Sequence, residues 1–170
     1  MARISSVLAP IVLVIGFLVG AARQPPYYDS LRDTISALAA HGAADRWIMT
    51  TALIVLGVCH LVTSYALSRP VLAVGGLCTV ALAIAAEPAI GSSAVHGVFA
   101  TIAFIALALW PLPQDRIAVG VIVVGLVWFW VELQSSDLVG LAERCVALAE
   151  AIWPIVVVSR EYARVRPRTP

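Results

Sequence analysis

The sequence predicts an all-α, polytopic integral membrane protein with six transmembrane helices. Three observations predict this class: 61% of the 170 residues are hydrophobic, only 12% are charged, and the mean hydropathy is +0.97. A soluble domain carries about 25% charged residues, and its core could not hide so many apolar side chains from water. The solvent around this chain is therefore predicted to be a bilayer.

The apolar residues fall into six runs of about 17–21 residues, which is enough to cross a hydrocarbon core of roughly 30 Å. In chain order the runs are 5–22, 47–67, 70–86, 94–112, 117–133 and 138–158. The third run is among the shortest and has Gly75 and Gly76 in its middle, where small residues permit close helix contact. No linker or low-complexity tract interrupts the pattern, so residues 1–170 are predicted to form a single transmembrane domain.

The arginines predict the orientation, because short cytoplasmic loops carry an excess of basic residues. With a cytoplasmic N-terminus, the inner side carries Arg3, Arg69, Arg116, Arg160, Arg164, Arg166 and Arg168. The outer side then carries Arg23, Arg32 and Arg46. Both termini are therefore predicted to be cytoplasmic, in a multi-pass protein of the cell's inner (plasma) membrane.

The longest outer loop, residues 23–46, contains the stretch DSLRDTISALAAHG. Ser30 is a good N-cap, and Asp33 follows at capping-box spacing and adds negative charge to the first turn. One apolar face repeats at intervals of three and four residues: Leu31, Ile35, Leu38 and Ala39. With Gly42 as its stop, the stretch predicts a helix over about 31–41. Three turns are marginal alone in water, so this helix is expected to pack as a lid on the outer mouth of the bundle.

Several ionisable residues lie in or beside the apolar runs, where each costs at least about 2.5–3.5 kcal/mol near the bilayer centre. Four of them lie near the outer ends of their runs: Glu87, His96, Glu132 and Asp137. Glu143 and Arg144 lie one to two turns inside the last run, under the same outer mouth. Together these residues predict a polar ligand-binding site open to the outer leaflet. For Glu87 and Glu132, snorkelling into headgroups or water is the structural alternative.

Two ionisable residues are predicted to lie deeper. At 1.5 Å per residue, His60 is about 20 Å and Glu150 about 18 Å below the outer surface. Matching depth predicts a buried polar pair joined by a hydrogen bond. Such pairs often only hold helices together, at about 0.6 kcal/mol each. A proton relay through Glu143, Glu150 and His60 is the functional alternative.

Other chemistries lack a signature. A net charge of +1 gives no reason to expect a nucleic-acid partner. No ligand spacing such as HExxH is present, so no metal or other cofactor is predicted. No GxSxG element marks a nucleophilic serine.

Three stretches resemble the bacterial membrane-protein family catalogued as domain of unknown function 998. They are DTISALAAHGAADRWIM, HGVFATIAFIALALWP and GLAERCVALAEAIW. The resemblance covers about 7–158, and after the loop motif its most specific part is the G-L-x-E-R element from Gly140 to Arg144, with Trp153 beyond it. It implies a six-helix membrane protein without an established reaction. It also singles out five residues for the site: Asp33, Ser36, His96, Glu143 and Arg144.

The loop is also distantly similar to the eukaryotic Frag1/DRAM/Sfk1 group, whose first outer loop carries a P-x-I-S-x-L/T-G-like element. Thr34, Ile35, Ser36 and Leu38 match that element, and its glycine is absent here. Some proteins of that group are linked to lipid or glycolipid remodelling, so the similarity implies a lipid connection by analogy.

Three functions compete. An accessory or lipid-binding protein ranks first: membrane lipid is the partner, and Arg144 pairs with an anionic headgroup. An envelope lipid-modifying enzyme with His96 or Glu143 as general base ranks second, so catalysis is not the favoured expectation. A small transporter or proton-linked subunit that uses His60 and Glu150 ranks third. A role among other membrane-protein subunits stays open.

Overall fold

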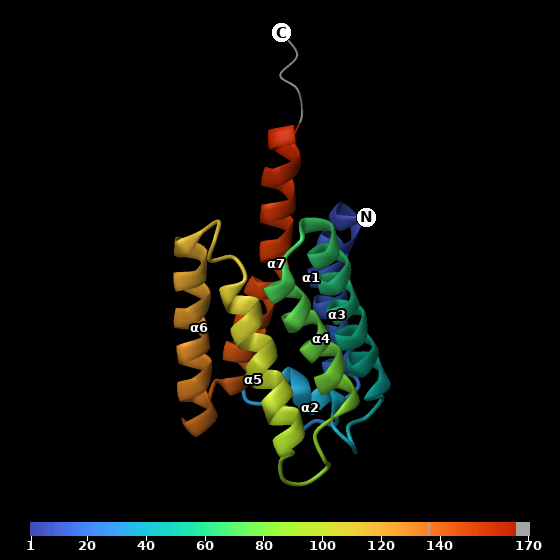
Figure 1. The fold of residues 1–170 in the computed structure, drawn as a ribbon. Coiled ribbons are helices and arrows are strands. Elements are labelled where there is room, and N and C mark those ends of the chain that lie inside the picture. Colours follow the sequence, from blue (N-terminus) through green and yellow to red (C-terminus); the bar gives the residue numbers. More distant parts are fainter. Residues whose placement is uncertain (136, 166–170) are drawn as a thin grey trace.

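The computed structural model describes residues 1–135 and 137–165, and within these ranges the fold is all-α with seven helices (Figure 1). The helices are α1 Ala2–Ala22, α2 Ile35–Ala39, α3 Trp47–Leu67, α4 Pro70–Ile84, α5 Ala94–Leu109, α6 Arg116–Ser135 and α7 Val139–Val165. Consecutive long helices run in opposite directions, so Met1 and the end of α7 lie at one end of the bundle, the terminal face (Figure 1). The opposite end carries residues 23–46 and is called the loop face.

Apolar length and composition indicate a membrane protein. Among the described residues, α1, α3 and α6 are long and apolar enough to cross a membrane, with mean hydropathies of 2.5, 1.8 and 2.0. α4 and α5 are shorter apolar helices of 15 and 16 residues. The six long helices occupy the six predicted apolar runs, while their being six membrane spans stays a prediction.

Two helices end earlier than predicted, one of them at a proline, and a polar tail lengthens a third. α4 ends two residues and α5 three residues before the predicted limits. Beyond α4, Ala85 has left the helical region and Pro88 follows; beyond α5, Pro111 lacks the N–H that would continue the ladder. α7 instead continues past the predicted residue 158 to Val165, because a polar sequence can stay helical after the apolar run ends.

Glycines let the central helices touch. A Cβ on Gly57 of α3 would lie 2.6 Å from the carbonyl oxygen of Gly76 on α4. A Cβ on Gly75 would lie 2.6 Å from Leu107 of α5. The predicted close helix contact at Gly75 and Gly76 is therefore confirmed, and larger residues there would force the helices apart.

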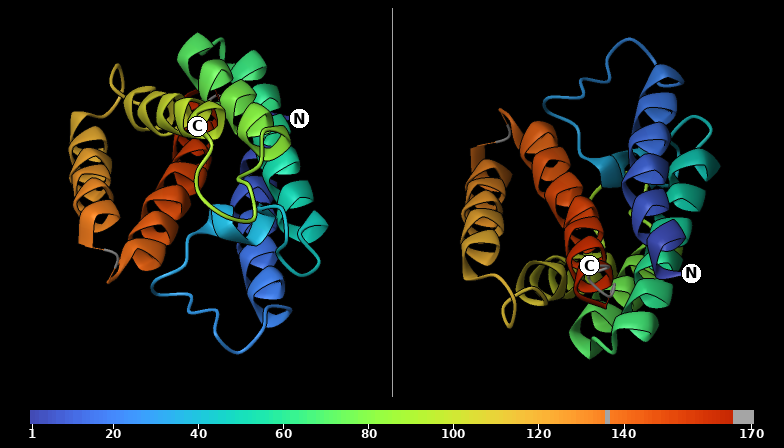
Figure 2. Two further views of the ribbon diagram at one scale, coloured as in Figure 1. Left: turned by 90° about the horizontal axis from the view of Figure 1, so that it is seen from below. Right: turned by 90° about the horizontal axis from the view of Figure 1, so that it is seen from above.

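The helix α6 stands at the edge of the bundle. Figure 2 shows it beside α7 and away from α1, α3 and α4. Only 17% of its apolar window is buried, and Ile117 and Val124 are 81% and 71% exposed. A long apolar helix with so little protein around it suits a hydrocarbon environment.

The loop helix is shorter than predicted: α2 spans Ile35–Ala39 instead of about 31–41. Its N-cap is Thr34, whose Oγ1 accepts from the Ala37 N–H at 3.1 Å, so the predicted cap at Ser30 is wrong. The chain before Thr34 forms a turn instead, because Asp29 and Asp33 bond to the local backbone. The Asp33 carboxylate accepts from the Asp29 N–H at 2.7 Å, and the Asp29 carboxylate accepts from the Leu31 N–H at 2.9 Å.

The end of the loop helix also differs from the prediction. Ala40 is already extended, with φ −64° and ψ 154°, so α2 ends before Gly42. Gly42 serves a later turn, where its φ of +99° is a conformation that glycine adopts without strain.

The helix α2 packs into the bundle, as predicted. Ile35, Leu38 and Ala39 are 3%, 1% and 2% exposed and join a core cluster with Leu13 of α1 and Met49 of α3. Leu31, which was expected on the same face, is 49% exposed because it lies in the turn outside the helix. Seen from the loop face, α2 lies across the ends of the long helices (Figure 2).

Candidate functional site

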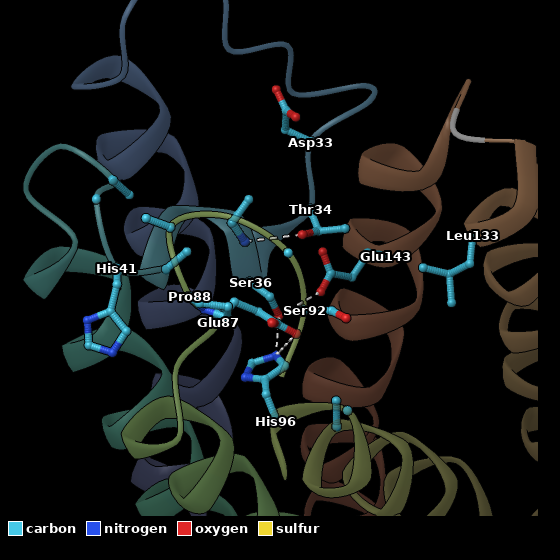
Figure 3. A pocket seen from close by; sticks show the side chains of 18 of the residues that line it. Asp33, Thr34, Ser36, His41, Glu87, Pro88, Ser92, His96, Leu133 and Glu143 are labelled. Atoms are coloured by element: carbon cyan, nitrogen blue, oxygen red, sulfur yellow. Dashed lines mark hydrogen bonds and ion pairs between the residues drawn. The ribbon is translucent and has the colours of Figure 1, made fainter. Parts of the chain in front are cut away.

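A pocket of about 910 Å³ lies at the loop face, between α2, α5, α6, α7 and the neighbouring loops (Figure 3). Its polar end includes Ser36, Glu87, His96 and Glu143, and Asp33 also lines the pocket. Its apolar wall is formed by Phe104 and Ile105 of α5 and by Leu126, Phe129, Trp130 and Leu133 of α6. The pocket is thus amphipathic, and exposed Ile105 and Trp130 carry the apolar wall to the protein surface.

Ser36 and His96 meet at the polar end. The Ser36 Oγ lies 3.2 Å from His96 Nε2, although the two residues are 60 positions apart. Ser36 is the second residue of α2. His96 lies in the first turn of α5, which follows the N-cap Ser93. The sequence singled out both residues but gave no sign that they touch.

The other ring nitrogen of His96 faces the end of α4. Nδ1 lies 3.2 Å from the Leu82 carbonyl oxygen and 3.0 Å from the Ala85 carbonyl oxygen. Carbonyl oxygens only accept hydrogen bonds, so Nδ1 carries the proton and donates to them. In the neutral ring, Nε2 is then an acceptor directed at the Ser36 hydroxyl.

Glu143 connects α7 to α2. This carboxylate is 4% exposed, and its two oxygens accept from the Ile35 N–H and, at 3.4 Å, from the Ser36 hydroxyl. A five-residue helix leaves its first N–H groups without helical partners, and Glu143 satisfies one of them from another helix. Glu143 therefore holds Ser36 in place against His96.

Glu87 completes the polar end from the connection between α4 and α5. Its Oε1 lies 3.9 Å from His96 Nε2, and its Oε2 accepts from the Ser93 N–H at 2.7 Å. The structure thus brings four of the predicted site residues together: Ser36, Glu87, His96 and Glu143.

Arg144 is placed differently from the prediction. It is not among the described residues that line the pocket, because its guanidinium points to the loop before α2. Its Nη1 donates at 2.8 Å to each of three carbonyl oxygens: Ser30, Asp33 and Gly140. Its Nη2 donates to the Tyr28 hydroxyl at 2.6 Å. Three of these four hydrogen bonds clamp the loop onto α7, and the bond to Gly140 lies within α7.

Tyr28 and Asp33 belong to the same clamp. Burial raises the pKa of the Tyr28 hydroxyl above its ordinary value of 10, and the Arg144 charge opposes that rise. The Asp33 side chain points away from Ser36 and His96 (Figure 3), and its backbone carbonyl, not its carboxylate, contacts Arg144. The Asp33 carboxylate bonds to the Asp29 N–H instead and forms no described ion pair with Arg144. Tyr28 is a residue that the sequence analysis missed, since nothing in its local sequence marks a partner 116 positions away.

Glu132 also lies outside the pocket as far as the described residues define it. Its carboxylate accepts from the Trp128 indole N–H, the Ser135 hydroxyl and the Leu138 N–H, at 3.1, 2.9 and 2.9 Å. These contacts organise the turn between α6 and α7. Asp137 is exposed in that turn.

The deep pair is buried but not joined. His60 and Glu150 are each 1% exposed and line one cavity of about 50 Å³. Within the described residues, neither ring nitrogen of His60 nor Oε1 of Glu150 has a hydrogen-bond partner, so the predicted bond between them is wrong. Both residues lie at the cavity, as their depth along the helices predicted, but no described hydrogen bond joins them.

The described part of the chain contains no group of three or more His, Cys, Asp or Glu side chains arranged to hold a metal ion. The polar end of the pocket is instead a hydrogen-bonded cluster of one hydroxyl, one imidazole and two carboxylates. Such a cluster can bind hydrogen-bond donors and can exchange protons with a ligand.

The fold and site define a helical, apolar protein with an amphipathic pocket at one end of its bundle. The chain belongs to the family described as "Protein of unknown function (DUF998)", whose model matches residues 7–160. The predicted family membership is therefore confirmed, while the similarity to the Frag1/DRAM/Sfk1 group stays a prediction. No curated protein and no solved structure matches the chain significantly.

Proposed function

We propose that this protein binds an amphipathic membrane lipid in the pocket at the loop face, as an accessory protein of the envelope. The observation that carries the proposal is the joining of a polar end and an apolar wall in one pocket of about 910 Å³. The headgroup lies at Ser36, Glu87, His96 and Glu143, and an acyl chain runs along Phe129 and Trp130. A volume of this size is in the usual range for small-molecule sites.

The same proposal includes the membrane arrangement. All six long helices span the inner membrane of a bacterium, both termini are cytoplasmic, and the loop face is outside. The excess of arginine toward the terminal face supports this orientation. The pocket then opens toward lipids of the outer leaflet through the exposed apolar wall of α6.

The charges of the polar end favour one headgroup chemistry. Its carboxylates, Glu87 and Glu143, accept hydrogen bonds, and the nearest arginine of α7, Arg144, is committed to the loop. A headgroup rich in donors, such as hydroxyl or ammonium groups, suits these acceptors better than a bare phosphate. The expected pairing of Arg144 with an anionic headgroup is accordingly not retained in the proposal.

Native mass spectrometry of the protein extracted in mild detergent tests the proposal. We expect one lipid class to remain bound, and Trp130→Ala to reduce its occupancy several-fold. Trp47→Ala is the matched control, because Trp47 and Trp130 are 63% and 64% exposed and only Trp130 lines the pocket. Equal occupancy in the two variants, or no retained lipid in the wild type, contradicts the proposal.

A further inference from the structure

We infer that Ser36 and His96 form a nucleophile–base dyad that takes an acyl group from a carboxylic ester of the bound lipid. The lipid as substrate rests on the proposed function, whereas the dyad itself rests on the contacts of two side chains. The Ser36 Oγ is 3.2 Å from His96 Nε2 and lines the large pocket. A nucleophilic hydroxyl within hydrogen-bond reach of an imidazole is the basic arrangement of serine acyl-transfer sites.

The tautomer of His96 suits this role. The Leu82 and Ala85 carbonyl oxygens at 3.2 and 3.0 Å fix the proton on Nδ1 and orient the ring. Nε2 is left with its lone pair toward the hydroxyl of Ser36. The two carbonyls thus do for this ring what an orienting carboxylate does in a serine triad.

The two carboxylates have different tasks: Glu87 stabilises the positive charge that the reaction produces on the His96 ring, and Glu143 positions Ser36. When Nε2 takes a proton, the imidazolium lies 3.9 Å from Glu87 Oε1. Glu143 accepts from the Ile35 N–H, and its other oxygen lies 3.4 Å from the Ser36 Oγ, so it holds the nucleophile in place on α2. The hydroxyl has one proton, which is directed either at Glu143 or, for the reaction, at the nearer His96 Nε2 at 3.2 Å. Glu143 is therefore a positioning residue in this scheme.

The position of the dyad selects the bond that reacts. Ser36 and His96 lie in the polar end, next to the apolar wall that begins at Phe104 on the same helix as His96. In an ester lipid, the carbonyl carbon lies where the headgroup region meets the acyl chain. A lipid whose chain lies along α5 and α6 thus presents its ester to Ser36.

The proposed step balances as follows. His96 Nε2 takes the hydroxyl proton as Ser36 Oγ bonds to the ester carbonyl carbon, and the ring then gives that proton to the leaving alkoxide as the carbon–oxygen bond breaks. The products are an acyl ester on Ser36 and the deacylated lipid alcohol. Water or a second lipid hydroxyl, activated by the same ring, takes the acyl group from Ser36 and restores the free hydroxyl.

Labelling with a short-chain fluorophosphonate tests the dyad, because this probe reacts with activated serines and needs no lipid binding. We expect one adduct, mapped to Ser36 by peptide mass spectrometry, and none in Ser36→Ala. His96→Gln should slow labelling about 100-fold or more, the scale of general-base assistance. Ser30→Ala is the matched control, since Ser30 lies in the same loop outside the set of described pocket residues.

Retained lipid is measured on the same samples. Protein that keeps its lipid but gives no Ser36 adduct overturns the dyad and leaves the lipid-binding proposal standing. A Ser36 adduct in protein that retains no lipid supports the dyad and overturns lipid binding, which leaves a soluble ester as the substrate class.

A second variant separates activation from mere hydrogen bonding. Ser36→Cys, in a Cys145→Ser background that removes the exposed native thiol, keeps a nucleophile of similar shape. We expect its alkylation by iodoacetamide at pH 7 to be about tenfold faster with His96 than with His96→Gln, because a neighbouring imidazole favours the thiolate. Equal rates in properly folded protein overturn the role of His96 as base.

Discussion

The two polar regions of the bundle differ in whether their buried polar groups have hydrogen-bond partners. At the loop face, Ser36, His96 and Glu143 each bond to a partner, and backbone groups supply several of those bonds. Deeper in the bundle, His60 and Glu150 line a cavity of about 50 Å³ and have buried atoms without partners among the described residues. The difference comes from α2: its first N–H group and the Ser36 hydroxyl contact Glu143 and His96 at the loop face, whereas Ile35 and Ser36 line the deep cavity without bonding to His60.

Hydrogen bonds organise the polar side chains at the loop face more completely than those deeper in the bundle. A buried polar atom without a partner costs about 1–3 kcal/mol, so the deep residues weaken the fold unless something else occupies the cavity beside them. Ser36 and Glu143 line both cavities, so they form the boundary between the two regions. Hydrogen bonds hold the loop-face side chains in position, whereas none is described for the ring nitrogens of His60 or for Oε1 of Glu150.

We expect the largest loss of stability when the Glu143 carboxylate is removed from the loop-face cluster. Glu143→Ala leaves the Ile35 N–H and the Ser36 hydroxyl without their carboxylate partner in a buried place. We expect a loss of about 3 kcal/mol in the free energy of unfolding, since hydrogen bonds to charged groups contribute about 1.5–3 kcal/mol. Thermal unfolding in detergent measures this loss, and an unchanged midpoint would show that α2 does not depend on α7.

Arg144→Ala should have the next largest effect. It removes the bonds to Ser30, Asp33 and Tyr28, so we expect residues 23–34 to become sensitive to protease and stability to fall by about 2 kcal/mol. Arg144→Lys should restore little, because an ammonium cannot reach the same fork of partners. The bound lipid should keep its class, in contrast to a variant that changes the headgroup site.

Glu150→Leu should have a smaller effect of the opposite sign. Replacing a buried carboxyl that has an unpartnered oxygen removes a desolvation cost and fills space at the cavity. We expect stability to rise by about 1 kcal/mol. Thermal unfolding in detergent measures this gain, and Glu143→Leu, which should lose stability, is the variant for comparison. A clear loss of stability in Glu150→Leu would mean that the deep region is organised as well, and would revive the proton-relay hypothesis.

The smallest expected effect lies outside both regions, at the terminal face. Asp115 caps α6 by accepting from the Ala118 N–H at 3.0 Å and also pairs with Arg160 at 3.0 Å. These contacts hold the pKa of Asp115 below its ordinary value of 3.8, the Ala118 N–H contributing most. A lowered folded-state pKa means that the stabilisation is present above the unfolded value and is lost as the pH falls through the folded value.

Thermal midpoints between pH 3 and pH 7 test that effect. Asp115→Ala should be slightly less stable than wild type at neutral pH, and the difference should shrink as the pH falls below about 4. A difference that is constant over this range would assign the effect to the loss of the side chain and not of its charge.

Much of the architecture followed from local sequence. The six apolar runs marked all six long helices, and Pro111 accounts for the early end of α5. The limits of α2 were wrong because Thr34 competes with Ser30 as the cap and because Asp29 and Asp33 form a turn of their own. Ser and Thr both cap helices well, and the cap at Thr34 goes with the packing of Ile35 and Leu38 in the core.

The residues of the candidate site could be predicted from the sequence, but their contacts could not. Ionisable residues in apolar runs stand out, so His96, Glu143 and Arg144 could be picked out, and the resemblance pointed to Ser36. Their roles could not be assigned, because Arg144 and Glu143 are neighbours in sequence but point to different partners. Glu143 reaches α2 and the pocket, whereas Arg144 reaches the loop before α2.

The hydropathy pattern was enough to identify an apolar helical bundle, and the local motifs were enough to identify the family matched over residues 7–160. Hydropathy is summed over some twenty residues, so small errors in position do not change the result. Only the folded structure shows that Ser36 contacts His96 and that Glu143 bonds to the Ile35 N–H. It also shows that no described hydrogen bond joins His60 and Glu150. A hydrogen bond needs its donor–acceptor distance to be correct to within a few tenths of an ångström. That distance depends on how the helices pack, which no pattern along the chain specifies.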